Sequence, residues 1–297
     1  MSLKNKVTPE EWQVRVDLAA AYRLCEFYDM TDLTGTHLSA RVPGERNNFL
    51  LNPYGLYFEE VTASSLVKLT LDGDVIEDHL GLGVNSAGYT IHSAVLSGRD
   101  DLDAVMHTHT RAGIAVSSME CGLLPMSQHS MHFHKSVSYH DYEGVAVNLD
   151  EREMLQRDLG SSNKAMMLKN HGLLTAGVSV PDAFYTLMRL EKSCQAQVDA
   201  MSTGAELHLV PEAVSDHTNG QFKNRGTELG DRGWPGHLRR LDKMDRFHLQ
   251  FPFYVFHGLL LGLLPSQMQS FSRGDFDLPP KLLFLGYALS FDAAHYY

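Results

Sequence analysis

The sequence is poor in cysteine and in positive charge. Its 297 residues include only three cysteines, Cys25, Cys121 and Cys194, and the formal net charge is −11. Three widely spaced cysteines exclude a disulfide framework and a Cys-x-x-Cys zinc site, and they fit a reducing, cytoplasmic compartment. Because a protein that binds nucleic acid needs basic patches and no run of five or more Lys and Arg occurs, we expect no nucleic-acid partner.

Motifs for nucleotides, export and membranes are missing as well. No Gly-x-Gly-x-x-Gly or P-loop string occurs, so a nucleotide cofactor has no support. The N-terminus lacks the apolar core of a signal peptide and instead predicts a helix, with Thr8 as N-cap, Pro9 as first residue and Glu11 as third. The apolar run at 251–265 is shorter than the roughly 20 residues of a membrane-spanning helix and contains proline and glycine, so we expect no membrane partner.

Helical and strand-like patterns mix between about residues 8 and 210. Short, partly alternating segments separated by Pro-Gly and Asp-Gly turns predict an antiparallel sheet with strands at 37–42, 48–51 and 66–71. Further strands are predicted at 104–109, 143–147 and 165–168, and helices at 9–28, 86–98, 112–118, 150–159 and 181–201. The last of these helices is expected to carry Glu191 on its polar face.

Three of the 16 histidines have a spacing that suits a metal. His107 and His109, in the string VMHTHTR, are two residues apart near a strand end, so both side chains point to the same face. His171 follows a second apolar strand, in the string LKNHGLLTAG. Three imidazoles on neighbouring strand ends can bind one cation and leave a position open for substrate. Spacing alone leaves open the alternative that these are structural or solvated histidines.

The two histidine strings, in this order and about 60 residues apart, resemble the class II aldolase/adducin family. The resemblance spans about residues 10–210 and includes TGTHLSARVPG and the long helix after NHG. It implies a three-layer α/β/α sandwich with a mainly antiparallel central sheet, usually a homotetramer with active sites between subunits. It also implies that His107, His109 and His171 hold zinc or another divalent ion such as Mn²⁺.

The chain departs from the family pattern at the expected substrate contacts. Family aldolases that act on sugar phosphates carry a Ser-Ser-Glu-like string, whereas this chain has Ser86, Ala87 and Gly88, so the usual acid/base carboxylate is missing. Tyr54 stands where a phosphate-holding Thr is typical, and His37 stands where an Asn commonly contacts the substrate carbonyl. We predict His37 and Ser86 as substrate contacts, and these departures argue against an aldolase or epimerase that acts on a sugar phosphate.

A replacement proton donor is sought in residues 128–142, which are dense in titratable groups. His140 and Tyr139 are the catalytic candidates, with Asp141 as the group that orients the imidazole, because a neutral imidazole or phenol transfers protons near neutral pH. The alternative is that this segment is only a polar loop. His92, within an apolar helical stripe, is interpreted as a core histidine whose hydrogen bonds are satisfied.

These observations predict a divalent-metal-dependent carbon–carbon lyase, of the aldolase or decarboxylase type, that acts on a small hydroxy or oxo acid or a sugar-derived molecule. The alternatives are a non-catalytic, adducin-like assembly module and a family epimerase or dehydratase. The composition changes at Arg246, where charges become rare. We therefore predict a family domain at 1–245 and an atypical hydrophobic extension at 246–297, which is either a packing arm at a subunit interface or sequence foreign to the family.

Overall fold

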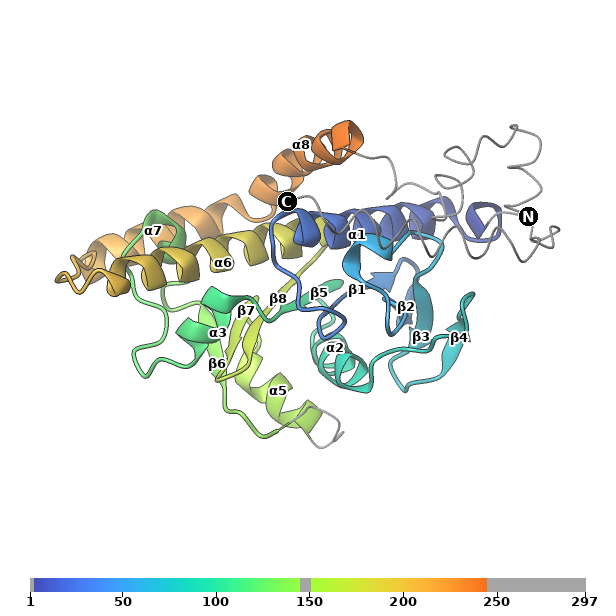
Figure 1. The fold of residues 1–297 in the computed structure, drawn as a ribbon, viewed down its shortest axis with the longest axis horizontal. Helices are drawn as coiled ribbons and strands as arrows, with labels where there is room; N and C mark the ends of the chain where they lie inside the picture. Colours follow the sequence, from blue (N-terminus) through green and yellow to red (C-terminus); the bar gives the residue numbers. More distant parts are fainter. Residues whose placement is uncertain (1–2, 145–150, 245–297) are drawn as a thin grey trace, which may run out of the picture. The chain divides into compact units, whose positions relative to one another are not determined.

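A computed structural model describes residues 3–144 and 151–244 (Figure 1). Its centre is an eight-stranded sheet with the order β4-β3-β2-β1-β5-β8-β7-β6. Neighbouring strands are antiparallel except for the parallel pair β6 and β7, so the sheet is mainly antiparallel, as expected. The strands are β1 His37–Val42, β2 Glu45–Leu51, β3 Val67–Thr70, β4 Val75–Glu77, β5 Ala104–Thr108, β6 Val137–His140, β7 Ala165–Leu168 and β8 Gly172–Gly177.

The main helices begin where the sequence places polar caps. The Thr8 hydroxyl accepts a hydrogen bond from the Glu11 amide at 3.1 Å, and the Asn85 side chain accepts one from the Ala87 amide at 2.9 Å. Such caps satisfy backbone donors that have no partner within the helix. The helices are α1 Pro9–Phe27, α2 Ser86–Gly98, α3 Arg111–Ser117, α4 Gln128–Met131, α5 Glu151–Leu159, α6 Val180–Ser202, α7 Glu212–Arg225 and α8 Glu228–Met244, with 3-10 turns η1 Leu3–Asn5 and η2 Phe58–Glu60.

Helices cover both faces of the sheet and complete a three-layer α/β/α sandwich (Figure 1). Helix α1 packs on β1, α6 packs on β5 and β8, and α8 packs on α1 and α6. On the other face α2 contacts β5, α5 contacts β6, and the two helices pack on each other. Each face has its own hydrophobic core, with Phe184 in the core beside α6 and Ile91 in the core beside α2. Within the described ranges, no helix combines the length and apolar character needed to span a membrane.

The alternation of side chains along β1 decides which of its residues face α2. Leu38 and Ala40 belong to the core on the α1 and α6 side. Ser39 points the other way and is hydrogen-bonded to His92 of α2. His37, two residues before Ser39, therefore shares the α2 face, and the β1–β5 register places it directly opposite His107.

Two predictions about the strands differ from the structure. Glu143 and Gly144, the described part of the strand predicted at 143–147, are not in a strand, so that prediction is wrong there. The strand in this region is β6, for which the sequence predicted no strand because apolar periodicity is weak; a polar loop was only the alternative to a source of the proton donor. The polar side chain of Ser138 can be buried in this strand because its hydroxyl donates a hydrogen bond to the Leu159 carbonyl at 3.2 Å. The predicted extension at 246–297 lies outside the described residues.

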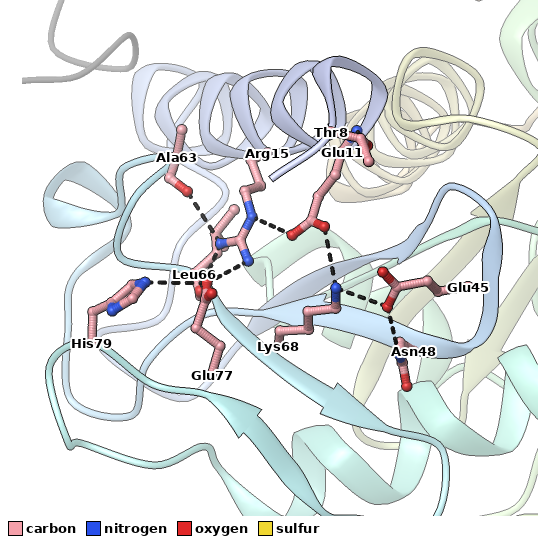
Figure 2. A network of polar contacts seen from close by, with 10 residues as sticks. All are labelled: Thr8, Glu11, Arg15, Glu45, Asn48, Ala63, Leu66, Lys68, Glu77 and His79. Atoms are coloured by element: carbon pink, nitrogen blue, oxygen red, sulfur yellow. Dashed lines mark hydrogen bonds and ion pairs between the residues drawn. The ribbon is translucent and has the colours of Figure 1, made fainter. Parts of the chain in front are cut away.

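A buried polar network fastens α1 to the β2–β4 side of the sheet (Figure 2). Arg15 is fully buried and pairs with Glu11 at 2.9 Å and with Glu77 at 2.8 Å. Its guanidinium also donates to the Leu66 carbonyl at 3.0 Å. Lys68 contacts the second oxygen of Glu11 at 3.1 Å, so the buried carboxylate has two cationic partners. Arg15 thus links the first helix to two segments about 50 and 60 residues further along the chain.

Replacing Arg15 with methionine is expected to lower the free energy of unfolding by about 3–5 kcal/mol, because removing one partner leaves buried charge and carbonyl groups unpaired. Chemical denaturation measures the change. Arg232→Met on α8 is the matched control, since the Arg232 side chain is 76% exposed and pairs only with Glu228 within the described residues. Equal losses in the two variants would contradict a structural role for the Arg15 network.

Candidate metal centre

Three imidazoles converge at the ends of the neighbouring strands β5, β7 and β8: those of His107, His109 and His171. His107 lies in β5, His109 follows that strand, and His171 lies in the turn between β7 and β8. One nitrogen of each ring lies within 4.8 Å of the other two. The turn is held close to β5 by Gly172, because a Cβ there would come within 2.4 Å of the Thr108 carbonyl oxygen. The glycine after His171 therefore allows the three imidazoles to meet.

Hydrogen bonds to the outer nitrogens fix the tautomers of two of these rings. His107 Nδ1 lies 2.9 Å from the Leu173 carbonyl oxygen, and His109 Nδ1 lies 2.9 Å from the Asp32 carboxylate. Both oxygens accept hydrogen bonds, so each Nδ1 carries the proton and each Nε2 presents a lone pair. A carbonyl or carboxylate behind the ring is the usual support of a metal-binding histidine.

The two lone pairs face each other. Nε2 of His107 and Nε2 of His109 are 2.8 Å apart. With both Nδ1 atoms acting as donors, neutral rings have no proton to place between the two Nε2 atoms. A cation between the rings removes this repulsion, and three imidazole nitrogens are a donor set that suits Zn²⁺ and similar ions. The residues therefore fit a divalent metal.

Burial favours the neutral form of His107 and His171, which is the form that binds metal. Burial lowers the pKa of His107 and lowers the pKa of His171 to about 4. Behind them, burial also lowers the pKa of His37, and it lowers that of His92 to about 3. His92 is fully buried and hydrogen-bonded to His37 and Ser39, so its interpretation as a satisfied core histidine is confirmed.

The depressed pKa of His92 makes stability fall in acid. An unfolded chain protonates this histidine near pH 6.5, whereas the folded chain does so only near 3. Its contribution is unchanged above pH 6.5 and is lost progressively as the pH falls from 6.5 to 3. At pH 5 the loss in free energy of unfolding is roughly 2 kcal/mol. Denaturation of wild type and His92→Gln at pH 7.5 and 5 measures it, and an equally steep acid loss in the variant would contradict the assignment.

The His37 ring occupies the space beside Gly88. Its Nδ1 lies 2.8 Å from His92 Nε2, and its ring centroid lies 5.1 Å from that of His107. A Cβ at position 88 would approach the His37 ring to 2.7 Å. The missing carboxylate and the histidine in place of asparagine are therefore linked, because a larger side chain at position 88 and this ring cannot share the space.

The predicted catalytic pair separates onto two faces of β6. His140 faces α5, where Nδ1 lies 2.7 Å from the Asp158 carboxylate, and it lines a small cavity together with His171. Tyr139 points to the opposite face, where its hydroxyl accepts a hydrogen bond from the Leu123 amide at 3.0 Å. The structure thus brings His140, but not Tyr139, to the histidine cluster. Asp141, predicted to orient His140, instead pairs with Lys169 at 2.6 Å.

Two other predicted positions are resolved by their contacts. Ser86 is exposed and is the first residue of α2, two residues before Gly88, which packs against the His37 ring. Glu191, predicted on the polar face of the long helix, is buried, and that prediction is wrong. Its carboxylate accepts a hydrogen bond from the Thr110 hydroxyl at 2.5 Å. Because Thr110 caps α3 directly after His109, Glu191 supports the backbone of the histidine strand end.

Three residues that contact these histidines were not found from the sequence. Asp32 supports His109, Ser39 is bonded to His92, and Asp158 is bonded to His140. Asp32 follows the helix predicted at 9–28, where the sequence carries no metal-ligand pattern. Leu33 beside it has a left-handed backbone conformation, with φ +49°, and this turn brings the Asp32 carboxylate to the metal cluster.

The fold and the three-histidine cluster define a class II aldolase-like domain, and comparison with known proteins agrees. The model of the family "Class II Aldolase and Adducin N-terminal domain" matches residues 16–198. The structure is similar to an aldolase II superfamily protein from Pseudomonas syringae, at 49% identity and a TM-score of 0.80 over 84% of this chain and 99% of that one. The chain belongs to the class II aldolase and adducin N-terminal domain family.

Two further relatives show the range of the family. An L-fuculose 1-phosphate aldolase from Glaciozyma antarctica is similar at 27% identity and a TM-score of 0.71, over 81% of this chain and 93% of that one. Alpha-adducin from Mus musculus is 44% identical over 191 residues, which are 64% of this chain and 26% of adducin. The family domain is thus shared by a protein named as an aldolase and by one named as an adducin.

Proposed function

We propose that this protein is a divalent-metal-dependent carbon–carbon lyase that acts on a small hydroxy or oxo acid. The observation that carries the proposal is the pair of facing Nε2 atoms of His107 and His109, 2.8 Å apart, with both outer nitrogens already bound to acceptors. His171 completes the donor set. Membership of a family that includes aldolases supports the lyase assignment.

His107, His109 and His171 would hold the ion, and Zn²⁺ or Mn²⁺ suits the site. A divalent cation supplies Lewis-acid stabilisation of the negative charge that develops on a substrate oxygen when a neighbouring carbon–carbon bond breaks. The residues around the ion then bind the substrate and move protons. His37 is proposed to contact a substrate oxygen from β1, and Ser86 is proposed to contact it from the exposed start of α2.

His140 is the proposed proton donor. The Asp158 carboxylate accepts a hydrogen bond from His140 Nδ1, so it orients the ring. Nε2 of His140 is buried and makes no hydrogen bond within the described residues, and a carboxylate oxygen of Glu151 lies 3.6 Å from it. His140 lines the cavity that also includes His171 and Tyr142. After the carbon–carbon bond breaks and its electron pair stays on the substrate, Nε2 would deliver a proton to the resulting carbanion carbon.

The substrate is expected to lack a phosphate group. With no carboxylate at position 88, removal of a proton from a substrate hydroxyl loses a contribution typically on the order of 10²–10⁴-fold. We expect negligible cleavage of L-fuculose 1-phosphate and turnover of a non-phosphorylated 2-oxo or 2-hydroxy acid, assayed as release of CO₂ or aldehyde. Cleavage of the sugar phosphate on the order of 1–10³ per second would contradict this substrate class.

A second candidate function is an assembly module without chemistry, which the 44% identity to alpha-adducin favours. The two candidates differ in the activity of the metal-loaded protein. A lyase releases CO₂ or aldehyde from its acid substrate, whereas an assembly module releases no product. A family epimerase or dehydratase is a third candidate, and it would release neither CO₂ nor aldehyde in the same assay.

A cytoplasmic homotetramer is proposed as the working form. Two large apolar side chains beside the cluster are exposed in the single chain: Leu33 is 70% and Tyr142 is 55% exposed. Leu33 follows Asp32, which supports His109, and the Tyr142 ring centroid lies 6.2 Å from that of His171. Exposed apolar groups of this kind around a site support a neighbouring subunit that covers it.

A further inference from the structure

A chain of buried polar side chains runs from β1 through α2 to the metal cluster. The Ser39 hydroxyl lies 2.5 Å from His92 Nδ1, and His92 Nε2 lies 2.8 Å from His37 Nδ1. Ser39 and His92 are fully buried, and His37 is 2% exposed. The His37 ring is within contact range of both His92 and His107, with centroid distances of 4.8 and 5.1 Å. The chain therefore connects the interior of the protein to the metal ligands.

The direction of the hydrogen bonds follows from the serine. Within the described residues, His92 Nδ1 is the only hydrogen-bond partner of the Ser39 hydroxyl. If His92 Nδ1 carried a proton, the hydroxyl hydrogen would be buried without an acceptor, and leaving a buried donor unsatisfied is costly. The hydroxyl therefore donates to His92 Nδ1, and the proton of this neutral ring is on Nε2.

The position of the proton on His92 in turn fixes the position of the proton on His37. His92 Nε2 donates to His37 Nδ1, so the proton of a neutral His37 is on Nε2. This atom has no hydrogen-bond partner within the described residues. His37, which is 2% exposed and whose ring centroid lies 5.1 Å from that of His107, thus ends the chain with an N–H group that has no acceptor within the described residues.

We propose that Ser39 and His92 are positioning residues that fix His37 as a hydrogen-bond donor, so that the site selects a substrate oxygen with lone pairs, a carboxylate or carbonyl, beside the three metal histidines. The selection of substrate rests on the proposed function, whereas the tautomers do not. Gly88 belongs to the same device, because only glycine leaves room for the His37 ring.

Nuclear magnetic resonance of protein labelled with ¹⁵N-histidine tests the tautomers directly. Both His37 and His92 are expected as Nε2–H tautomers, with signals assigned from His37→Gln and His92→Gln. In Ser39→Ala the donor to His92 is lost, so the His92 tautomer is expected to change or become mixed. Ser93→Ala is the matched control: Ser93 is buried beside His92, but its hydroxyl donates to the Thr90 carbonyl at 3.3 Å. An Nδ1–H tautomer at either histidine of the wild type would overturn the proposal, even if Ser39→Ala does not fold.

Binding of oxalate to Zn²⁺-loaded protein tests the consequence for ligands. The affinity for this dicarboxylate is expected to fall about tenfold or more in Ser39→Ala, as for loss of a hydrogen bond to a charged group, and to stay unchanged in Ser93→Ala. Equal affinities in Ser39→Ala and wild type would overturn the link to substrate selection. Neither measurement needs turnover, so a failure of the lyase function leaves both results interpretable.

Discussion

The double variant His107→Ala/His171→Ala is expected to lose stoichiometric divalent metal while remaining soluble. Two of three donor nitrogens are removed, and a single imidazole on a strand end has little affinity for a divalent ion. The fold is expected to survive because neither side chain belongs to the two hydrophobic clusters that pack the faces of the sheet, although His107 is buried at the end of β5. Inductively coupled plasma mass spectrometry of the purified protein measures the number of metal ions per chain.

The Asp32 carboxylate behind His109 is expected to affect metal affinity less than a metal-binding histidine does. Asp32→Asn weakens the acceptor behind His109 without removing a ligand, so metal affinity should fall about 10–100-fold, the effect typical of such supporting groups. Asp72→Asn is the matched control, since Asp72 lies in an exposed turn away from the histidines. Stoichiometric metal in the double histidine variant would show that the ion is held elsewhere.

Replacing His140 with glutamine is expected to lower turnover on the order of 10²–10⁴-fold while leaving metal content unchanged. Glutamine keeps a hydrogen-bond donor near Asp158, but its amide does not transfer protons near neutral pH. The effect should be on kcat, because the proton is moved in the chemical step and His140 is not one of the three metal histidines. Steady-state kinetics measure this loss, with the 2-oxo or 2-hydroxy acid that the wild-type protein turns over as substrate.

Tyr139→Phe is the control for His140, because the two residues are adjacent on β6 and face opposite sides. The Tyr139 hydroxyl accepts from the Leu123 amide, so its removal should leave kcat nearly unchanged. A loss of turnover in Tyr139→Phe as large as in His140→Gln would contradict the assignment of the proton donor to the α5 face.

The convergence of the three histidines could be predicted from the sequence because its signals are local. His107 and His109 share a face by the two-residue period of a strand, and the glycine after His171 marks the turn that brings the third ring close. The antiparallel strands and the caps of α1 and α2 were likewise written in short patterns of apolar and turn residues.

The supporting residues could not be predicted because their signals are not local. Asp32 reaches His109 across 77 positions and Ser39 reaches His92 across 53, so no spacing rule connects them. Strand β6 was missed for a related reason, since the burial of Ser138 and His140 depends on acceptors at Leu159 and Asp158. Periodicity detects apolar burial, whereas buried polar groups are explained only by partners that folding brings to them.

We propose that the three histidines hold a divalent ion that is needed for cleavage of a carbon–carbon bond. The most direct test is to remove metal from the purified protein, add back Zn²⁺ or Mn²⁺ stepwise, and measure release of CO₂ or aldehyde from a panel of small 2-oxo and 2-hydroxy acids. We expect no product from metal-free protein and product formation that saturates at one ion per chain. Product release that is independent of added metal, or no release from any acid by the fully loaded protein, would contradict it.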